Sequence, residues 1–374
     1  MLDDALKLSF FFRYPKKTLS LHKHNHKAMN TKHFIQALSL LFLITCAGNS
    51  IFAQQFLQYW GNPDAMLQDQ ASLVIEQSYK ILEKYPPSTQ ASDERKLALY
   101  ALDVLMHDTR LDNTPVFGAY MNRMASHVLE QLQKEKPVDS ETRLYRFYNH
   151  GFIVQTSTVT IGIDLVRGGR RNAPVIDDSL MRAIVNQCNM FFISHAHGDH
   201  ADSTVIRMFW ENGKNVIVPP ELLIGSLPNL ITLRGEKQIS QTFRSAQSNA
   251  LLNVSVYSGH QGSMPNNLYV ITLPNGHTIM HTGDQDNPED LELISNIGND
   301  VKVDILLAHC WIRPVEKIIE GVRPSLVICG HENEMEHTID HREAYWMTFH
   351  RMANIGTPSI VMAWGESYRY RFEQ

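Results

Sequence analysis

FFISHAHGDHAD, residues 191–202, places a short apolar run directly before three histidines and two aspartates. The apolar run is predicted to be a buried strand, because it is short and is followed at once by polar residues. His195 and His197 are separated by one residue, so a tightly turned backbone can direct both rings at one ion. Asp199 and His200 then turn toward a second position beside it. Imidazole and carboxylate groups at this density favour zinc, with iron or manganese as alternatives, over a surface cluster of histidines.

Three further polar residues follow predicted strands later in the chain. They are His260 at the end of YSGH, Asp284 at the end of MHTGD and His331 at the end of VICGH. A single histidine after a strand is more often structural than a metal ligand, so each of these residues is weak evidence when taken alone.

Phe191–His200 resembles the HxHxDH signature of the metallo-β-lactamase superfamily. The further ligands of that superfamily lie at the ends of later strands in the order His, Asp, His, and the three residues above follow that order. The stretch NHGFIV, residues 149–154, is similar to the opening hairpin of the lactonase and N-acyl-phosphatidylethanolamine phospholipase D-like branch. The resemblance covers about residues 144–374, and residues 54–135 lie outside it.

The resemblance implies an α/β fold, an α+β sandwich with αββα layers, which here follows a small all-helical region. It also implies two divalent metal ions. The first ion would be held by His195, His197 and His260, the second by Asp199, His200 and His331, and Asp284 would bridge them. Two such ions can activate a shared water as hydroxide and polarise the group to be cleaved, and Asp199 can accept a proton during turnover.

The ligand set narrows the expected activity to hydrolysis of an ester, lactone, amide or phosphodiester in a small-molecule or lipid-like substrate. True β-lactamases generally lack the bridging carboxylate of Asp284, and flavodiiron oxidoreductases carry glutamate where His197 stands. RNA-processing nucleases have basic patches, whereas this chain has a formal net charge of −5, so no nucleic acid partner is expected. The alternatives are a metal-containing binding or assembly protein of the cell envelope without turnover, and a redox role with iron.

Three other polar residues are candidates for contacts around the metals or the substrate. Asp164 is expected to orient a ligand histidine. His309 ends a predicted strand and is either a substrate contact or a buried histidine behind the ligands. His337 is expected to line the mouth of the pocket or to belong to a surface cluster with His341.

The beginning of the chain is typical of an export signal, predicted for residues 1–53 with Met29 as an alternative start. The apolar segment Phe34–Cys46 follows basic residues, and Ala53 is suited to cleavage. The segment is short for a membrane span and no later segment is long and apolar enough, so the mature protein is expected to be periplasmic or secreted. The alternatives are a lipoprotein anchored through Cys46 and a short buried helix.

The length of 374 residues and a hydrophobic content of 43% are typical of about two globular domains. Residues 54–140 are predicted to form a region of three amphipathic helices. Residues 141–374 are predicted to form the hydrolase domain, where strands alternate with helices. We expect the helical region to pack on the hydrolase domain and to shape access to the metals. No oligomeric state is predicted.

Overall fold

The computed structural model describes residues 61–108, 111, 114–134, 136–169, 175–222, 229–245, 247–309, 311–312 and 315–371. The chain divides into two compact units, Met1–Pro63 and Asp64–Gln374, and the second unit is described below. The predicted export signal, Met29, Cys46 and Cys310 lie outside the described residues. Within the described ranges, no helix is both long enough and apolar enough to cross a membrane.

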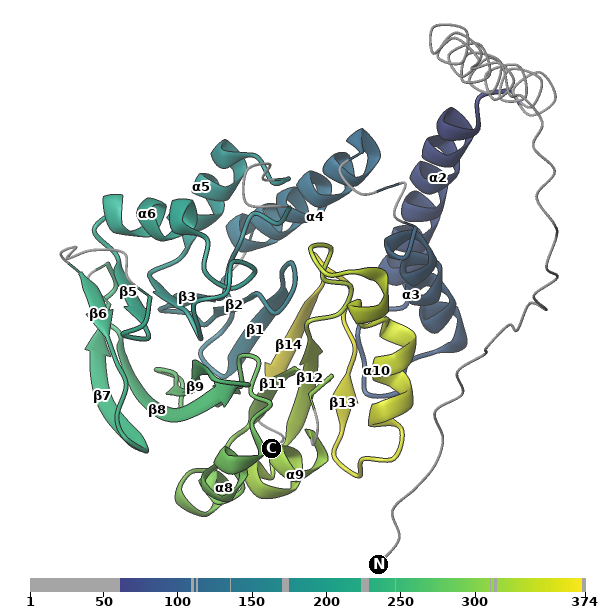
Figure 1. Ribbon diagram of the computed structural model, residues 1–374. Helices are drawn as coiled ribbons and strands as arrows, with labels where there is room; N and C mark the ends of the chain where they lie inside the picture. The colour runs from purple at the N-terminus through teal and green to yellow at the C-terminus, as the bar shows by residue number, and fades with distance from the viewer. Residues whose placement is uncertain are drawn as a thin grey trace, which may run out of the picture. The chain divides into compact units, whose positions relative to one another are not determined.

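Two seven-stranded sheets form the centre of the second unit (Figure 1). The first sheet contains, in spatial order, β14 (Ser367–Arg371), β1 (Glu141–Arg146), β2 (Phe152–Gln155), β3 (Thr160–Ile163), β4 (Met190–Phe192), β5 (Asn215–Val218) and β6 (Leu230–Thr232). The second contains β13 (Ser359–Ile360), β12 (Leu326–Gly330), β11 (Ile305–His309), β10 (Thr278–His281), β9 (Met264–Thr272), β8 (Leu251–Gln261) and β7 (Gln238–Arg244). The predicted mixed α/β class, with two layered sheets and helices, is confirmed.

Each sheet has an antiparallel half and a parallel half. In the first sheet the pairs from β14 to β3 are antiparallel and the pairs from β3 to β6 are parallel. In the second sheet the pairs from β7 to β10 are antiparallel and those from β10 to β13 are parallel. The carboxyl ends of parallel strands meet at one edge, so residues that follow β3 and β4, and those that follow β10, β11 and β12, are brought together in each sheet.

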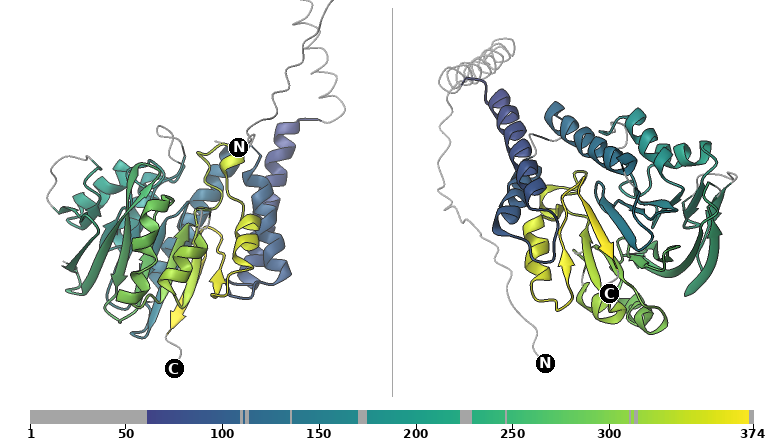
Figure 2. Two further views of the ribbon diagram at one scale, coloured as in Figure 1. Left: turned by 60° about the horizontal axis from the view of Figure 1, so that its bottom comes forward. Right: turned by 180° about the vertical axis from the view of Figure 1, so that it is seen from behind.

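Helices cover the outer faces of both sheets (Figures 1 and 2). One hydrophobic cluster joins residues of the first sheet to α2 (Pro63–Lys84), α3 (Asp93–Met106), α4 (Pro115–Lys134), α5 (Asp178–Gln187) and α6 (Ser203–Glu211). Another joins the second sheet to α7 (Leu291–Ile294), α8 (Ile297–Asp300) and α9 (Val315–Val322), and Met352 of α10 (Tyr345–Met352) belongs to it as well. A third cluster, including Phe152, Phe192 and Tyr269, fills the space between the sheets.

The helices α2 to α4 are fastened to the sheets by buried polar contacts as well as by apolar packing. Ser92 caps α3 by accepting a hydrogen bond from the Arg95 amide at 3.2 Å. The Arg95 guanidinium donates to both carboxylate oxygens of Glu366, at 2.7 and 2.6 Å. The Tyr79 hydroxyl donates to the carbonyl of Trp364. The helical region therefore shares one core with the layers that follow it.

Candidate metal centre

The loop that follows β4 is held in place by one buried carboxylate. Asp164, directly after β3, accepts hydrogen bonds from the Ser194 amide at 2.7 Å and from the Ser194 hydroxyl at 2.6 Å. Its Oδ2 also lies 2.9 Å from Nδ1 of His200. Since Nδ1 of His200 is engaged by Asp164, Nε2 is left to face the site. The structure therefore places Asp164 directly beside the far side of the His200 ring, a candidate ligand.

Four candidate ligands form a compact and largely buried cluster. One donor atom each from Asp199, His200, Asp284 and His331 lies within 4.8 Å of the others. Oδ2 of Asp284 is 3.0 Å from Nε2 of His200 and 3.3 Å from Nε2 of His331. Oδ2 of Asp199 is 3.4 and 3.5 Å from the same two nitrogens. Residues from three separate strand ends thus converge on one position.

The three residues expected to hold the first ion are only partly brought together. Nε2 of His195 lies 3.1 Å from Nδ1 of His197 and 3.8 Å from Oδ2 of Asp284. His260 lies near the end of β8, its side chain is 36% exposed, and its Nδ1 is 3.1 Å from a carboxylate oxygen of Asp290. Within the described part of the chain, no hydrogen bond or ion pair joins the His260 ring to another candidate ligand.

Two glycines allow the chain to approach closely just before two of the candidate ligands. Gly283 has a φ of 52°, in the left-handed region, and a β-carbon there would overlap the side chain of Asn266. A β-carbon on Gly330 would overlap the ring of His150. These contacts explain why Asp284 and His331 each follow a glycine.

Four further side chains contact the carboxylates of Asp284 and Asp199. Nδ1 of His309 and Nδ1 of His150 lie 3.3 and 3.7 Å from Oδ1 of Asp284. Asn149 donates its amide to Oδ2 of Asp199 at 3.0 Å, and Gln261 donates to Oδ2 of Asp284 at 3.2 Å. Only His309 was anticipated. The signal for the others was adjacency to a strand end or to a ligand, which many structural residues share.

The charges of the cluster are strongly coupled. Burial, the largest influence, would raise the pKa of Asp284, but the charges of His200, His331 and His309 hold it well below its usual range. Burial lowers the pKa of His331, yet Asp284 and Asp199 together raise it to about 10. For His195, burial and the charge of His200 lower the pKa to about 3. Two ionised carboxylates therefore create a site that attracts positive charge.

The donor set suits a divalent metal ion. Nε2 of His331, Oδ1 of Asp284 and both ring nitrogens of His309 are buried and have no hydrogen-bond partner among the described residues. Buried polar groups without partners are costly unless something else satisfies them. Imidazole nitrogens and carboxylate oxygens facing one position are the usual ligands of zinc and of related transition metals.

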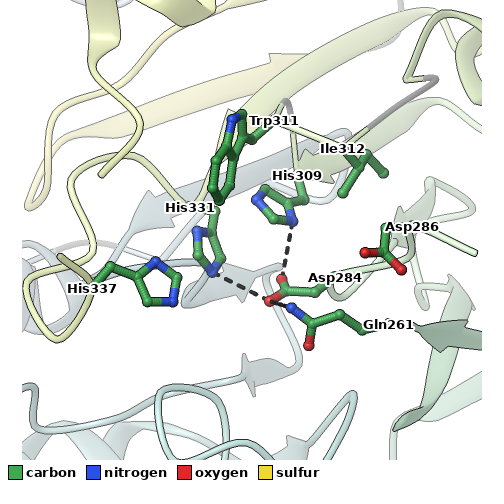
Figure 3. A pocket seen from close by; sticks show the side chains of 8 residues that line it. All are labelled: Gln261, Asp284, Asp286, His309, Trp311, Ile312, His331 and His337. Carbon is green, nitrogen blue, oxygen red and sulfur yellow. Dashed lines mark hydrogen bonds and ion pairs between the residues drawn. The ribbon is translucent and has the colours of Figure 1, made fainter. Parts of the chain in front are cut away.

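A cavity of about 360 Å³ opens beside the cluster (Figure 3). Its lining residues are Gln261, Asp284, Asp286, His309, Trp311, Ile312, His331 and His337. In Figure 3, His309, His331 and Gln261 point toward Asp284, and Trp311 and Ile312 provide apolar surface. His337 lines the cavity, with its ring centroid 5.6 Å from that of His331. The side chain of His341 is 59% exposed.

No family model matches the chain, and no curated protein matches it in sequence. Among solved structures, the fold is similar to a metallo hydrolase from the archaeon Ignicoccus hospitalis, with 18% identity, a TM-score of 0.46 and coverage of 62% of this chain and 100% of that one. The fold is also similar to that of CmlA, a diiron β-hydroxylase from Streptomyces venezuelae, with 11% identity and a TM-score of 0.43. That match covers 64% of this chain and 55% of that one. For a metallo-β-lactamase from Cronobacter sakazakii the identity is 19% and the TM-score 0.27. That match covers 48% of this chain and 80% of that one.

Metal-dependent hydrolases, including members of the metallo-β-lactamase superfamily, are thus among the structures that this chain resembles. The reaction has to be argued from the residues of the site itself, because these three identities are 19% or less and the TM-scores 0.46 or less.

Proposed function

We propose that this chain is a metal-dependent hydrolase whose centre binds two divalent ions. The observation that carries the proposal is the cluster of Asp199, His200, Asp284 and His331, with donor atoms within 4.8 Å of one another beside a cavity. A purely structural metal site is normally closed by its ligands, whereas His331 and Asp284 also line the cavity.

The residues that would hold the ions form two sets. His195, His197 and His260 would hold the first ion, Asp199, His200 and His331 would hold the second, and Asp284 would serve both. Two carboxylates orient these ligands from behind. Asp164 engages Nδ1 of His200, and Asp290 engages Nδ1 of His260. Both contacts leave Nε2 of the ring as the nitrogen available to an ion.

The ions, when bound, would supply Lewis acidity and lower the pKa of a water molecule. The chain's own residues would bind the substrate and move protons. Trp311 and Ile312 offer an apolar wall for the substrate, and His309 offers ring nitrogens without hydrogen-bond partners in the described structure. Asp199, held by the Asn149 amide at 3.0 Å, would accept a proton during turnover.

The finer parts of the proposal rest on the ligand types and on the sequence. We propose zinc as the metal, because histidine and carboxylate ligands suit it, with iron or manganese as alternatives. We propose an ester, lactone, amide or phosphodiester as the bond cleaved, in the manner of the lactonase and phospholipase D-like branch. We also propose export, with residues 54–140 as a helical region and residues 141–374 as the hydrolase domain.

The test combines metal analysis with a substrate panel on one sample of purified protein. Elemental analysis should find close to two ions per chain. Turnover of a lactone, thioester, phosphodiester or β-lactam should disappear after chelation and return when zinc is added. Folded protein that holds no metal before chelation would contradict the proposal. Metal without turnover on any panel member would favour a binding protein, and tightly held iron would favour redox chemistry.

A further inference from the structure

The segment after β12 forms both a candidate ligand and part of the cavity wall. Residues 331–344, here called the His331 loop, join β12 to α10. The loop contributes His331 to the cluster and His337 to the cavity. Its first four residues, His331 to Glu334, are at most 2% exposed. A polar segment at this depth needs partners for its side chains and its backbone.

Two residues near the start of the His331 loop have an unfavourable backbone conformation, and the loop is held by its own hydrogen bonds, such as Asn333 amide to Glu343 carbonyl at 2.7 Å, as well as by other elements. His331 has a φ of 78° and Asn333 a φ of 58°, both in the left-handed region. Asparagine tolerates this region better than histidine does. Residues in such conformations persist when the surrounding structure constrains them. The position of the His331 ring therefore depends on the bond from its own amide to the Asn149 carbonyl at 3.2 Å and on the contacts that hold the rest of the loop.

Asp103, on α3 of the helical region, supplies contacts at both ends of the loop. Its Oδ1 accepts a hydrogen bond from the Asn333 side-chain amide at 2.8 Å. The same oxygen accepts from the Tyr345 backbone amide at 2.8 Å, and Oδ2 accepts from the Trp346 amide at 2.9 Å. Asp103 is itself 6% exposed. One carboxylate thus joins the beginning of the loop to the helix that follows it.

Asp103 also replaces a missing helix cap. The N-cap residue of α10 is Ala344, which has no side chain able to accept a hydrogen bond. The first amides of a helix have no partner within the helix and need an acceptor. Asp103 provides that acceptor from a different helix, to the first two residues of α10.

A second tie runs between the end of α3 and the same loop. The guanidinium of Arg342 donates to the carbonyl of Met106 at 2.6 Å. It also donates to the carbonyls of Met335 and His337, at 2.9 and 3.0 Å. The carbonyl of Met106 belongs to the last turn of α3, so Arg342 and Asp103 hold the loop against one helix.

From these contacts we infer that Asp103 is a positioning residue of the metal centre: the helical region fixes His331 by holding both ends of its loop. The inference rests on the proposed function, because it assigns His331 to a metal. It implies that α3 of the helical region contributes to binding the ion by positioning His331.

The experiment compares Asp103→Asn and Asp103→Ala with a matched control in the full protein, after chelation and titration with Co²⁺. Asn presents an N–H₂ group where Asp103 accepts hydrogen bonds from backbone amides, and Ala leaves all three donors unpaired. The control is Glu366→Gln, which weakens the buried contact of Arg95 on the same helix without touching the loop. Circular dichroism and thermal unfolding record the fold of each variant.

We expect the Asp103 variants to bind Co²⁺ about 10-fold more weakly at one of two sites, the lower end of the effect of losing a group that bonds a ligand directly, because Asp103 acts on His331 through Asn333. Their Co²⁺ absorption bands should change, while Glu366→Gln loses thermal stability and keeps its affinity. Folded Asp103→Asn with wild-type affinity and spectrum would overturn the inference, and so would an equal loss in the control. If Asp103→Ala does not fold, Asp103→Asn decides. Wild-type protein that binds no Co²⁺ would instead refute the proposed function, and the inference with it.

Discussion

Asp284 has more histidine neighbours than Asp164 or Asp199, and its two oxygens face different rings. Oδ2 lies within 3.8 Å of ring nitrogens of His195, His200 and His331. Oδ1 lies within 3.7 Å of His150 and His309. Oδ2 thus lies near a proposed ligand of the first ion, His195, and near two of the second, His200 and His331, so removal of the carboxylate should affect both ions.

Replacing Asp284 with Ala should therefore reduce the metal content from about two ions per chain to nearly none, since a bridging ligand is shared. Replacing His260 with Ala should remove mainly the first ion. Elemental analysis after gel filtration, with circular dichroism as the control for folding, measures both. If the two variants lose the same single ion and no more, Asp284 is not a bridge.

At the scale of single residues, the sequence predicts the candidate ligands that lie in a motif of fixed spacing or that follow strands in a known order. His195 to His200 lie in one short motif, and Asp284 and His331 follow strands in a recognisable order. His150 and Gln261 could not be found in this way. His150 precedes β2 of the first sheet, and Gln261 ends β8, which β9 separates from β10 in the second sheet. They reach Asp284 only through the folding of the chain, and that proximity leaves no mark on the spacing of residues.

At the scale of helices, strands and loops, a buried ion pair joins β1 to the His331 loop. Arg146 at the end of β1 donates to Glu332 at 3.0 Å, and both side chains are 0% exposed. Arg146 also donates to the carbonyl of Phe147. Removing one partner of such a pair leaves the other charge buried and alone.

Arg146→Met should lower the free energy of unfolding by about 3–5 kcal/mol, the range for breaking a buried ion pair. The matched control is Arg182→Met, which removes the contact of Arg182 with Glu211, where the side chains are 48% and 42% exposed. Arg182→Met should lower the free energy of unfolding by about 1 kcal/mol or less. Urea unfolding of both variants measures the difference, and equal losses would show that burial of the first pair has no energetic consequence.

The two sheets are also joined by His277, just before β10, whose Nδ1 lies 2.7 Å from the Thr142 hydroxyl of β1. Burial lowers the pKa of His277 below its usual value of about 6.5. As the pH falls through about 6.5, the unfolded chain binds a proton that the folded chain does not, so stability is lost toward low pH. The loss should continue down to the lowered pKa of the folded state.

Between pH 7.5 and pH 5.5, the free energy of unfolding should consequently fall less in His277→Gln than in the wild type. The comparison concerns this decrease and not the stability of either protein at pH 7.5. Urea unfolding at the two pH values, with both proteins free of metal, isolates the contribution of this residue. Identical losses in the two proteins would contradict the assignment of a neutral His277 in the fold.

The elements that sequence predicted well have a strong apolar pattern. The apolar spacing predicts helices over residues 178–187 and 203–211 and a strand over residues 215–218, and these are the bounds of α5, α6 and β5. The pattern does not predict β7, because most of its side chains, in QISQTFR, are exposed and polar. The pattern predicts a helix over residues 341–352, whereas α10 begins at Tyr345, since its start depends on Asp103 in another helix.

In the whole molecule, the centre draws on both sheets. His195 to His200 follow β4 of the first sheet, whereas Asp284 and His331 follow β10 and β12 of the second. Ions bound between them would add a connection between two layers that meet through apolar packing and through polar contacts such as that of His277 with Thr142. Because an unfolded chain does not preserve this arrangement, binding should stabilise the folded state.

Removing the metal should accordingly lower the thermal unfolding temperature, and adding it back should restore it. At a free metal concentration 100 times the dissociation constant, a single ion should raise the free energy of unfolding by about 2.7 kcal/mol. The shift should be absent in Asp284→Ala, which serves as the control for effects of the chelator on the protein. An equal shift in that variant would place the stabilising ion elsewhere.

The contacts of the helical region also bear on the order in which the molecule can be assembled during synthesis. Arg95 is 271 positions from its partner Glu366, Tyr79 is 285 from Trp364, and Asp103 is 230 from Asn333. The ribosome makes α2 and α3 long before it makes any of these partners. The first strand likewise receives its edge partner last, when Ser367–Arg371 pairs with β1. The contacts that fasten α2 and α3 to Trp364, Glu366 and Asn333 therefore form only after nearly the whole chain has been synthesised.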